Sequence, residues 1–203
     1  MPAARYFVFI EFTDPEVRKV LNILRQSLNG KRVNDEAHVT VRGPYTQRPD
    51  LELLKQWGEK LHGEAIFIAD VGMFETPKGY AVFLHAKSRV FDDIWWKPDF
   101  SGRVTRKTPH VTIFETTEKK SALAVKSFLE AEAIEIVTHG CKLTVYTSKQ
   151  HTLLSEDDHI LAERRKLPPE RITIKDNLFD RAIKLCKHLE KPELNPLFQQ
   201  MLL

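Results

Sequence analysis

The chain is poor in cysteine and has no long apolar run. Only Cys141 and Cys186 occur among its 203 residues, so we expect neither a disulfide framework nor a thiolate metal site. No uninterrupted apolar segment approaches the roughly 20 residues that a membrane-spanning helix needs. Residues 1–6 lack the basic and apolar regions of a signal peptide. These absences predict a cytoplasmic protein that does not enter a membrane.

The chain also lacks a large excess of charge of one sign. Its net charge is +3, and its isoelectric point is about 8.8. This balance fits an enzyme with a local cationic cleft better than a sequence-specific nucleic-acid binder. We find no clear cluster of His, Cys, Asp and Glu with metal-ligand spacing, so we expect neither a metal nor another cofactor.

What the sequence does contain is the pattern of a globular α+β protein. Apolar residues make up 42% of it and charged residues 29%, which argues against global disorder. The length suits one domain, or two lobes that share a core. Apolar periodicity and turn residues predict seven strands up to residue 148, at 5–12, 37–43, 65–74, 80–86, 110–114, 133–137 and 142–148. Helices are predicted near 15–28, 50–61, 90–96 and 117–132.

The character of the chain changes near residue 150. Two charge runs and Pro168-Pro169 precede a predicted short strand at 172–174 and an amphipathic helix at 177–189. We therefore divide the chain into a domain at 1–149 and a partly helical C-terminal extension at 150–203. The extension packs either on this domain or on a partner, and we otherwise expect a monomer.

One four-residue phrase occurs twice, as His-Val-Thr-Val at 38–41 and His-Val-Thr-Ile at 110–113. Side chains alternate between the two faces of a strand, so His38 and Thr40 share one face, as do His110 and Thr112. The apolar residues between them should lie in the core. Roughly one histidine in eight is followed two residues later by a hydroxyl residue by chance. Two copies with the same apolar interleaving favour a shared function over two unrelated strand histidines.

Two imidazoles and two hydroxyls are the groups that acid–base chemistry on a phosphodiester needs. Histidine has an unperturbed pKa near 6.5, so one ring can accept a proton while the other donates one. Threonine hydroxyls can donate hydrogen bonds to the phosphate oxygens. We therefore predict that His38 and His110 act as general base and general acid, in an order that the sequence does not define. Thr40 and Thr112 would hold the phosphate.

The pair of motifs resembles the two signatures of the two-histidine (2H) phosphoesterase superfamily, which includes 2′,5′ RNA ligase-like proteins and cyclic nucleotide phosphodiesterases. The resemblance covers His38, Thr40, His110 and Thr112 residue by residue, and the order of elements over about residues 5–148. It implies a bilobal, pseudo-symmetric α+β fold with a cleft between two antiparallel sheets and helices outside. It also implies metal-independent hydrolysis of a 2′,3′-cyclic phosphate on RNA or a nucleotide, or of a small cyclic or 2′,5′-linked nucleotide.

The residues around the motifs are candidates for substrate contacts. Arg42 shares the predicted catalytic face and is the strongest candidate for phosphate binding, although it departs from the apolar run that follows the motif in many RNA-directed members. Aromatic side chains can stack on a base, and a basic loop before the second motif can attract a phosphate. The remaining candidates are Tyr45, Trp95, Trp96, Arg103, Arg106, Lys107 and Phe114. Two alternatives stay open: a non-catalytic nucleotide or RNA binder, and RNA 2′,5′ end-joining at the same site.

Overall fold

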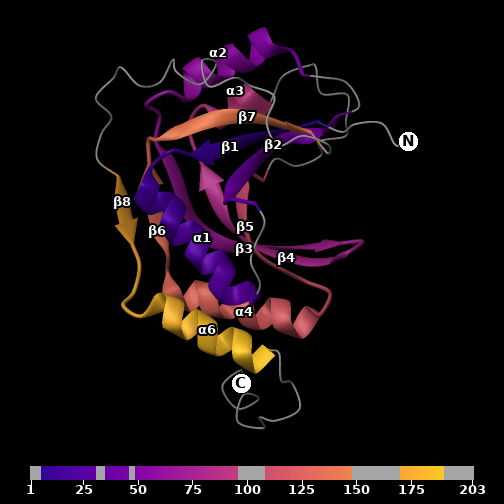
Figure 1. Cartoon of the computed structure of the whole chain (residues 1–203), viewed down its shortest axis with the longest axis vertical. Helices are drawn as coiled ribbons and strands as arrows, with labels where there is room; N and C mark the ends of the chain where they lie inside the picture. The colour runs from indigo at the N-terminus through magenta and orange to yellow at the C-terminus, as the bar shows by residue number, and fades with distance from the viewer. Residues whose placement is uncertain (1–5, 31–34, 46–48, 96–107, 148–169, 190–203) are drawn as a thin grey trace.

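A computed structural model describes residues 6–30, 35–45, 49–95, 108–147 and 170–189 (Figure 1). In these residues eight strands form one antiparallel sheet in the order β7-β1-β2-β5-β4-β3-β6-β8. The strands are β1 (Tyr6–Phe12), β2 (His38–Tyr45), β3 (Ile66–Thr76), β4 (Gly79–Lys87), β5 (His110–Thr116), β6 (Glu135–Thr138), β7 (Cys141–Thr147) and β8 (Arg171–Thr173). The described helices are α1 (Pro15–Asn29), α2 (Leu51–Leu61), α3 (Phe91–Trp95), α4 (Lys119–Glu132) and α6 (Leu178–Leu189).

The mixed α+β class is confirmed, but the strands form one sheet where two were expected. The junction between β2 and β5 is the most weakly paired part of this sheet. The register between β2 and β5 consists of the single pair Val39 and Val111, whereas β3 and β4 pair from Phe67 to Thr76. The junction thus joins a part made of β7, β1 and β2 to a part made of the other five strands. The bilobal, pseudo-symmetric arrangement of this sheet stays a prediction.

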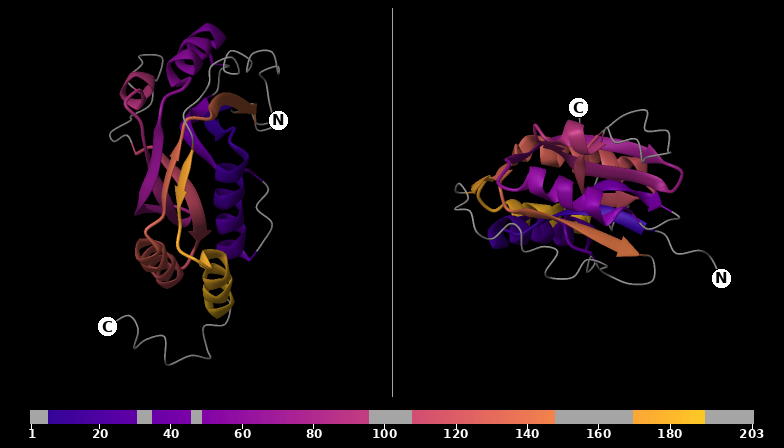
Figure 2. Two further views of the ribbon diagram at one scale, coloured as in Figure 1. Left: turned by 90° about the vertical axis from the view of Figure 1, so that its left-hand side faces the viewer. Right: turned by 90° about the horizontal axis from the view of Figure 1, so that it is seen from above.

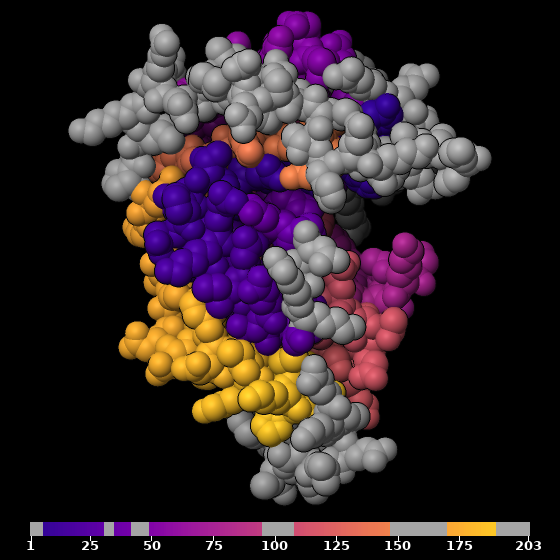
Figure 3. Space-filling view, viewed as in Figure 1, coloured from indigo at the N-terminus to yellow at the C-terminus, as the bar shows by residue number. Residues whose placement is uncertain are grey.

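The helices pack around the sheet in groups. Turned by 90°, the sheet is seen nearly edge-on, with α1 along one of its faces (Figure 2). Helix α6 lies beside α1, as both the contacts and the space-filling view show (Figure 3), and α4 covers β3, β4 and β5. The predicted burial of the four apolar motif residues is confirmed, since Val39, Val41, Val111 and Ile113 all belong to the core. None of the described helices is long and apolar enough to cross a membrane.

Residues 170–189 continue the same sheet and helix layer. Strand β8 pairs with β6, and the Glu170 carboxylate accepts hydrogen bonds from the backbone N–H groups of His139 and Gly140 in the turn before β7. Helix α6 is tied to α4 by an ion pair between Arg181 and the buried Glu132. This described part of the predicted extension therefore packs on the core.

The ends of three elements can be followed in detail. Asp14 is the N-cap of α1, and its carboxylate accepts a hydrogen bond from the Val17 N–H at 2.9 Å. The expected end of the second strand at Gly43 is wrong, because β2 continues through Pro44 to Tyr45. A shift in the β1–β2 register lies next to this segment, and such irregularities accommodate a residue without an N–H. The N-cap of α4 is Glu118, whose side chain makes no capping hydrogen bond.

Candidate active site

The two motif strands are neighbours in the sheet. Strands β2 and β5 run antiparallel with Val39 opposite Val111. Residues that stand opposite each other in an antiparallel pair share a face, so this register places His38 opposite Thr112 and Thr40 opposite His110. Each histidine thus faces the threonine of the other motif. The four polar side chains form a two-by-two group on one face of the sheet.

A pocket of about 270 Å³ lies at this group. Three of the four predicted catalytic residues line it: His38, Thr40 and Thr112. His110, the fourth, is adjacent through the β2–β5 register and packs against aromatic rings of β3 and β4. The other lining residues are Arg25, Asn29, Asp35, Ile113, Phe114 and Glu115.

The two histidines are held by the same backbone contact. His38 Nδ1 lies 2.8 Å from the Glu36 carbonyl oxygen, and His110 Nδ1 lies 2.6 Å from the Thr108 carbonyl oxygen. In each case the acceptor belongs to the residue two positions earlier. A carbonyl oxygen can only accept, so Nδ1 must carry the proton. Nε2 is then the nitrogen that accepts a proton when the ring is neutral and donates one when it is charged.

Each imidazole also packs on a phenylalanine from the strand on its outer side. Phe9 of β1 stacks on His38 with ring centroids 3.9 Å apart. Phe83 of β4 lies 4.7 Å from His110, and Phe74 of β3 meets the same ring edge-on at 5.0 Å. These contacts and the Nδ1 hydrogen bonds fix both rings from two directions. The site is therefore preorganised in the same way around both motifs.

Burial lowers the pKa of both histidines. For His38, the Glu36 carbonyl and the Asp35 carboxylate act in the opposite direction and favour the charged ring. For His110, the Thr108 carbonyl opposes burial, while the positive charges of His85 and His38 lower the pKa further. The two sites therefore differ: His38 has carboxylates nearby, and His110 has other histidines.

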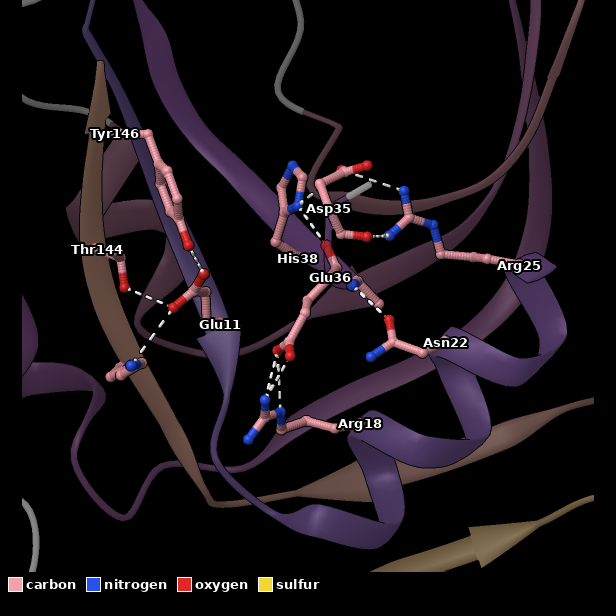
Figure 4. Close-up of polar contacts among 11 residues, drawn as sticks. Glu11, Arg18, Asn22, Arg25, Asp35, Glu36, His38, Thr144 and Tyr146 are labelled. Carbon is pink, nitrogen blue, oxygen red and sulfur yellow. Dashed lines mark hydrogen bonds and ion pairs between the residues drawn. The ribbon is translucent and has the colours of Figure 1, made fainter. Parts of the chain in front are cut away.

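One of these carboxylates belongs to a polar cluster beside His38. Glu11 of β1 stands opposite His38 in the β1–β2 register. Its carboxylate accepts hydrogen bonds from Thr144 Oγ1, at 2.8 Å, and from the Tyr146 hydroxyl (Figure 4). Lys142 Nζ lies 3.6 Å from Oε2 of the same Glu11 carboxylate. Burial sets the lowered pKa of His38, and the Glu11 carboxylate is the smallest of the influences that oppose this lowering.

The lowered pKa values predict that stability falls as the solution becomes acidic. An unfolded histidine titrates near pH 6.5, whereas folding lowers the pKa of His38 and His110. Below about pH 6.5 the unfolded chain then binds more protons than the folded chain, and the free energy of unfolding decreases. Urea denaturation at pH 7.5, 6.0 and 5.0 measures this slope. In the double variant His38→Gln with His110→Gln, the free energy of unfolding should depend less on pH. An unchanged pH dependence would contradict a lowered pKa for these two histidines.

Phe114, a predicted substrate contact, lies mostly in the core. Although it also lines the pocket, it is 8% exposed and belongs to the core cluster. The cause is a bulge in the β4–β5 pairing, where Val82 is opposite Phe114 but Phe83 is opposite Thr112. The extra residue in β5 reverses the alternation, so Phe114 turns toward the side of Val82.

The other predicted substrate contacts are not placed by the structure. Arg42 and Tyr45 lie on β2, and Trp95 ends α3, but their side chains are outside the described part of the chain. The remaining predicted contacts, Trp96, Arg103, Arg106 and Lys107, lie wholly outside the described residues. The roles proposed for all seven stay predictions.

Several residues at the site were missed in the sequence. His85 stands opposite His110 in the β4–β5 register, and alternation along 80–86 places it on the same face as Phe83, which was the available signal. Arg25 and Asn29 of α1 line the pocket. In the sequence, however, polar residues at this spacing are typical of the solvated side of a helix. Sequence alone does not show that this flank reaches the motif strands.

The described residues contain no group of three or more His, Cys, Asp and Glu side chains arranged to hold a metal ion. Comparisons with protein-family models, with curated proteins and with solved structures find no match for this chain.

Proposed function

We propose that this protein is a phosphodiesterase that uses His38 and His110 as an acid–base pair. The substrate class is a 2′,3′-cyclic phosphate on an RNA end or nucleotide, or a small cyclic or 2′,5′-linked nucleotide. The observation that carries the proposal is the matched setting of the two rings, each with Nδ1 on the carbonyl oxygen two residues earlier. The bilobal fold of the two-histidine phosphoesterases, which the motifs resemble, is part of this proposal.

The reaction needs two proton transfers at one phosphorus atom. The neutral ring takes a proton from water through Nε2, and the water oxygen forms a bond to phosphorus. The charged ring gives its Nε2 proton to the departing ribose oxygen as the P–O bond breaks. The product is a phosphomonoester when the substrate is a cyclic phosphate, and exchange with solvent restores the two protonation states. No metal ion takes part in this scheme.

The threonine hydroxyls have a separate task, which is to bind the phosphate. Thr112 is partly exposed and Thr40 is exposed, and each stands across from the histidine of the other motif. We expect Thr112→Val or Thr40→Val to lower kcat/KM roughly tenfold, because a hydrogen bond to a charged group contributes about 1.5 kcal/mol or more. Thr→Ser at the same positions keeps the hydroxyl and should retain most activity. Equal losses for Val and Ser would contradict phosphate binding by the hydroxyls.

A substrate panel tests the proposed reaction. It contains 2′,3′-cyclic mononucleotides, RNA ending in a cyclic phosphate, 2′,5′-oligoadenylate and 3′,5′-cyclic nucleotides, all assayed with a chelator present. We expect the wild type to cleave at least one of the cyclic-phosphate or 2′,5′-linked substrates and His38→Gln to be nearly inactive. Tight binding without turnover would favour a nucleotide-binding protein instead. Joining of RNA ends would favour the reverse reaction, and loss of turnover with chelator would contradict the mechanism.

A further inference from the structure

One flank of α1 carries a line of polar residues that reaches the candidate site. Arg18, Asn22, Arg25 and Asn29 are spaced by four, three and four residues, so they lie along one side of the helix. We call these four residues the polar stripe. It borders the buried face of α1, which packs on the sheet. Arg25 is itself only 7% exposed although it is charged, and a buried guanidinium has to be satisfied by hydrogen bonds.

Three members of the polar stripe hold three successive residues just before β2 (Figure 4). Arg25 donates to the carbonyl oxygen of Asp35 at 2.8 Å and to its carboxylate at 3.1 Å. Arg18 forms a two-pronged ion pair with the Glu36 carboxylate. Asn22 Oδ1 accepts a hydrogen bond from the Ala37 N–H at 2.8 Å. Residues 35–37 are thus each attached to α1, Asp35 and Ala37 through their backbone and Glu36 through its side chain.

The segment held in this way includes the carbonyl that determines the tautomer of His38. The Glu36 carbonyl oxygen accepts from His38 Nδ1 at 2.8 Å. The position of this oxygen depends on the orientation of the peptide between Glu36 and Ala37, and Asn22 holds that same peptide by its N–H. A hydrogen bond from α1 therefore acts on the His38 ring through one peptide group.

The fourth member ties the same helix to the other motif strand. Asn29 Nδ2 donates to the Ile113 carbonyl oxygen at 3.0 Å. Ile113 lies in the β5 bulge, where the register to β4 skips a residue. The sheet joins β2 and β5 through one residue pair only, so it constrains the two motif strands weakly. Through the polar stripe, α1 supplies a second connection between them.

We propose that the polar stripe of α1 positions His38 for catalysis. It fixes residues 35–37 and keeps Nδ1 of His38 protonated and Nε2 free. Through Asn29 it also fixes the position of this ring relative to β5. Arg18 and Asn22 are positioning residues in this role, since they act on His38 indirectly, Asn22 through the N–H of Ala37 and Arg18 through the Glu36 side chain. The proposal rests on the proposed function for its catalytic meaning, but its structural content, the state of the His38 ring, can be measured without any substrate.

The test compares two changes at Asn22 that have nearly the same size. Asn22→Leu removes the acceptor of the Ala37 N–H, whereas Asn22→Asp keeps an oxygen acceptor there. Long-range ¹H–¹⁵N NMR spectra of the full chain report the tautomer of each neutral histidine. We expect Nδ1–H at His38 in the wild type and in Asn22→Asp, and a mixture of tautomers in Asn22→Leu. His110, held by Thr108, serves as the internal reference and should keep its tautomer in every variant.

Two further variants serve as a negative control and as a second test of the polar stripe. Lys19→Ala changes an exposed residue on another side of α1 and should leave His38 unchanged. Arg18→Gln removes an exposed ion pair, is not expected to unfold the protein, and should shift His38 in the same direction as Asn22→Leu by a smaller amount. If Asn22→Leu does not fold, the tautomer of His38 in Arg18→Gln tests the proposal instead.

The outcomes separate this proposal from the proposed function. A changed His38 tautomer in Asn22→Leu, with rescue in Asn22→Asp, supports positioning even if no cyclic phosphate is cleaved. Once a substrate is known, Asn22→Leu should lower kcat at least fivefold with KM changed less than twofold. A wild-type His38 signal in Asn22→Leu, or equal changes in both Asn22 variants, would overturn the proposal.

Discussion

Replacement of His110 by glutamine is expected to lower kcat for a cyclic phosphodiester at least 100-fold while the protein stays folded. One positioned proton transfer typically contributes a factor of 10² to 10⁴, and glutamine cannot perform it. The same loss is expected for His38→Gln. Because the two rings carry out opposite transfers on one phosphate, the variants should lose turnover far more than they lose substrate affinity.

The measurement is kcat and KM for the best substrate of the panel, together with the free energy of unfolding in urea. His188→Gln is the matched control, since His188 is exposed on α6, away from the pocket. It should retain wild-type turnover. Near-normal kcat in a folded His38→Gln or His110→Gln variant would refute the acid–base assignment.

Gly72→Ala is expected to reduce the free energy of unfolding by about 1–3 kcal/mol, the usual range for overpacking a core. A Cβ atom at Gly72 would lie 2.3 Å from two ring atoms of Phe83 and 3.0 Å from His85 Nε2. Phe83 is 2% exposed and is stacked on Phe74 at a centroid distance of 4.3 Å. Its ring has little room to move, so the added methyl group has to distort the packing.

The same substitution should also reach the candidate site. Phe83 packs against His110, so we expect a displaced Phe83 ring to move the imidazole and lower kcat about tenfold, in line with the sensitivity of catalysis to small misplacements. Gly58→Ala is the control, because nothing lies within 4 Å of a Cβ at that helical position. It should stabilise the protein by about 0.5–1 kcal/mol. A stability of Gly72→Ala equal to the wild type would contradict this view of the packing.

The sequence predicted which face each motif residue takes, because strand alternation is local. His38 and Thr40 carry their polar groups away from the core, and Val39 and Val111 are fully buried as expected. The neighbouring position of β2 and β5 follows from the strand order, which local patterns do not encode. Phe114 shows the limit of alternation, since a bulge in the pairing with β4 reverses its face and leaves no local signal in the sequence.

The supporting residues of the site were harder to predict than the histidines themselves. Asn22 contacts Ala37 through a backbone N–H, so no complementary side chain in the sequence indicates the contact. Arg18 and Arg25 have the periodicity of a solvated flank, and only the packing of α1 on the sheet shows their partners. Gly72 carries no side chain, and its importance depends on the ring of Phe83 from the neighbouring strand.

The pH dependence of kcat/KM in the presence of chelator tests the central claim most directly. One ring must be neutral and the other charged, so the wild type should give a bell-shaped profile. Its maximum should lie at or below about pH 6.5, the ordinary value for histidine, because burial lowers the pKa of both rings. The pH profile of the residual activity should lose one limb in each of His38→Gln and His110→Gln. The variant that lacks the general base should lose the acidic limb, and the variant that lacks the general acid should lose the alkaline limb. A wild-type profile without two limbs, or the full bell in either variant, would contradict a two-histidine mechanism.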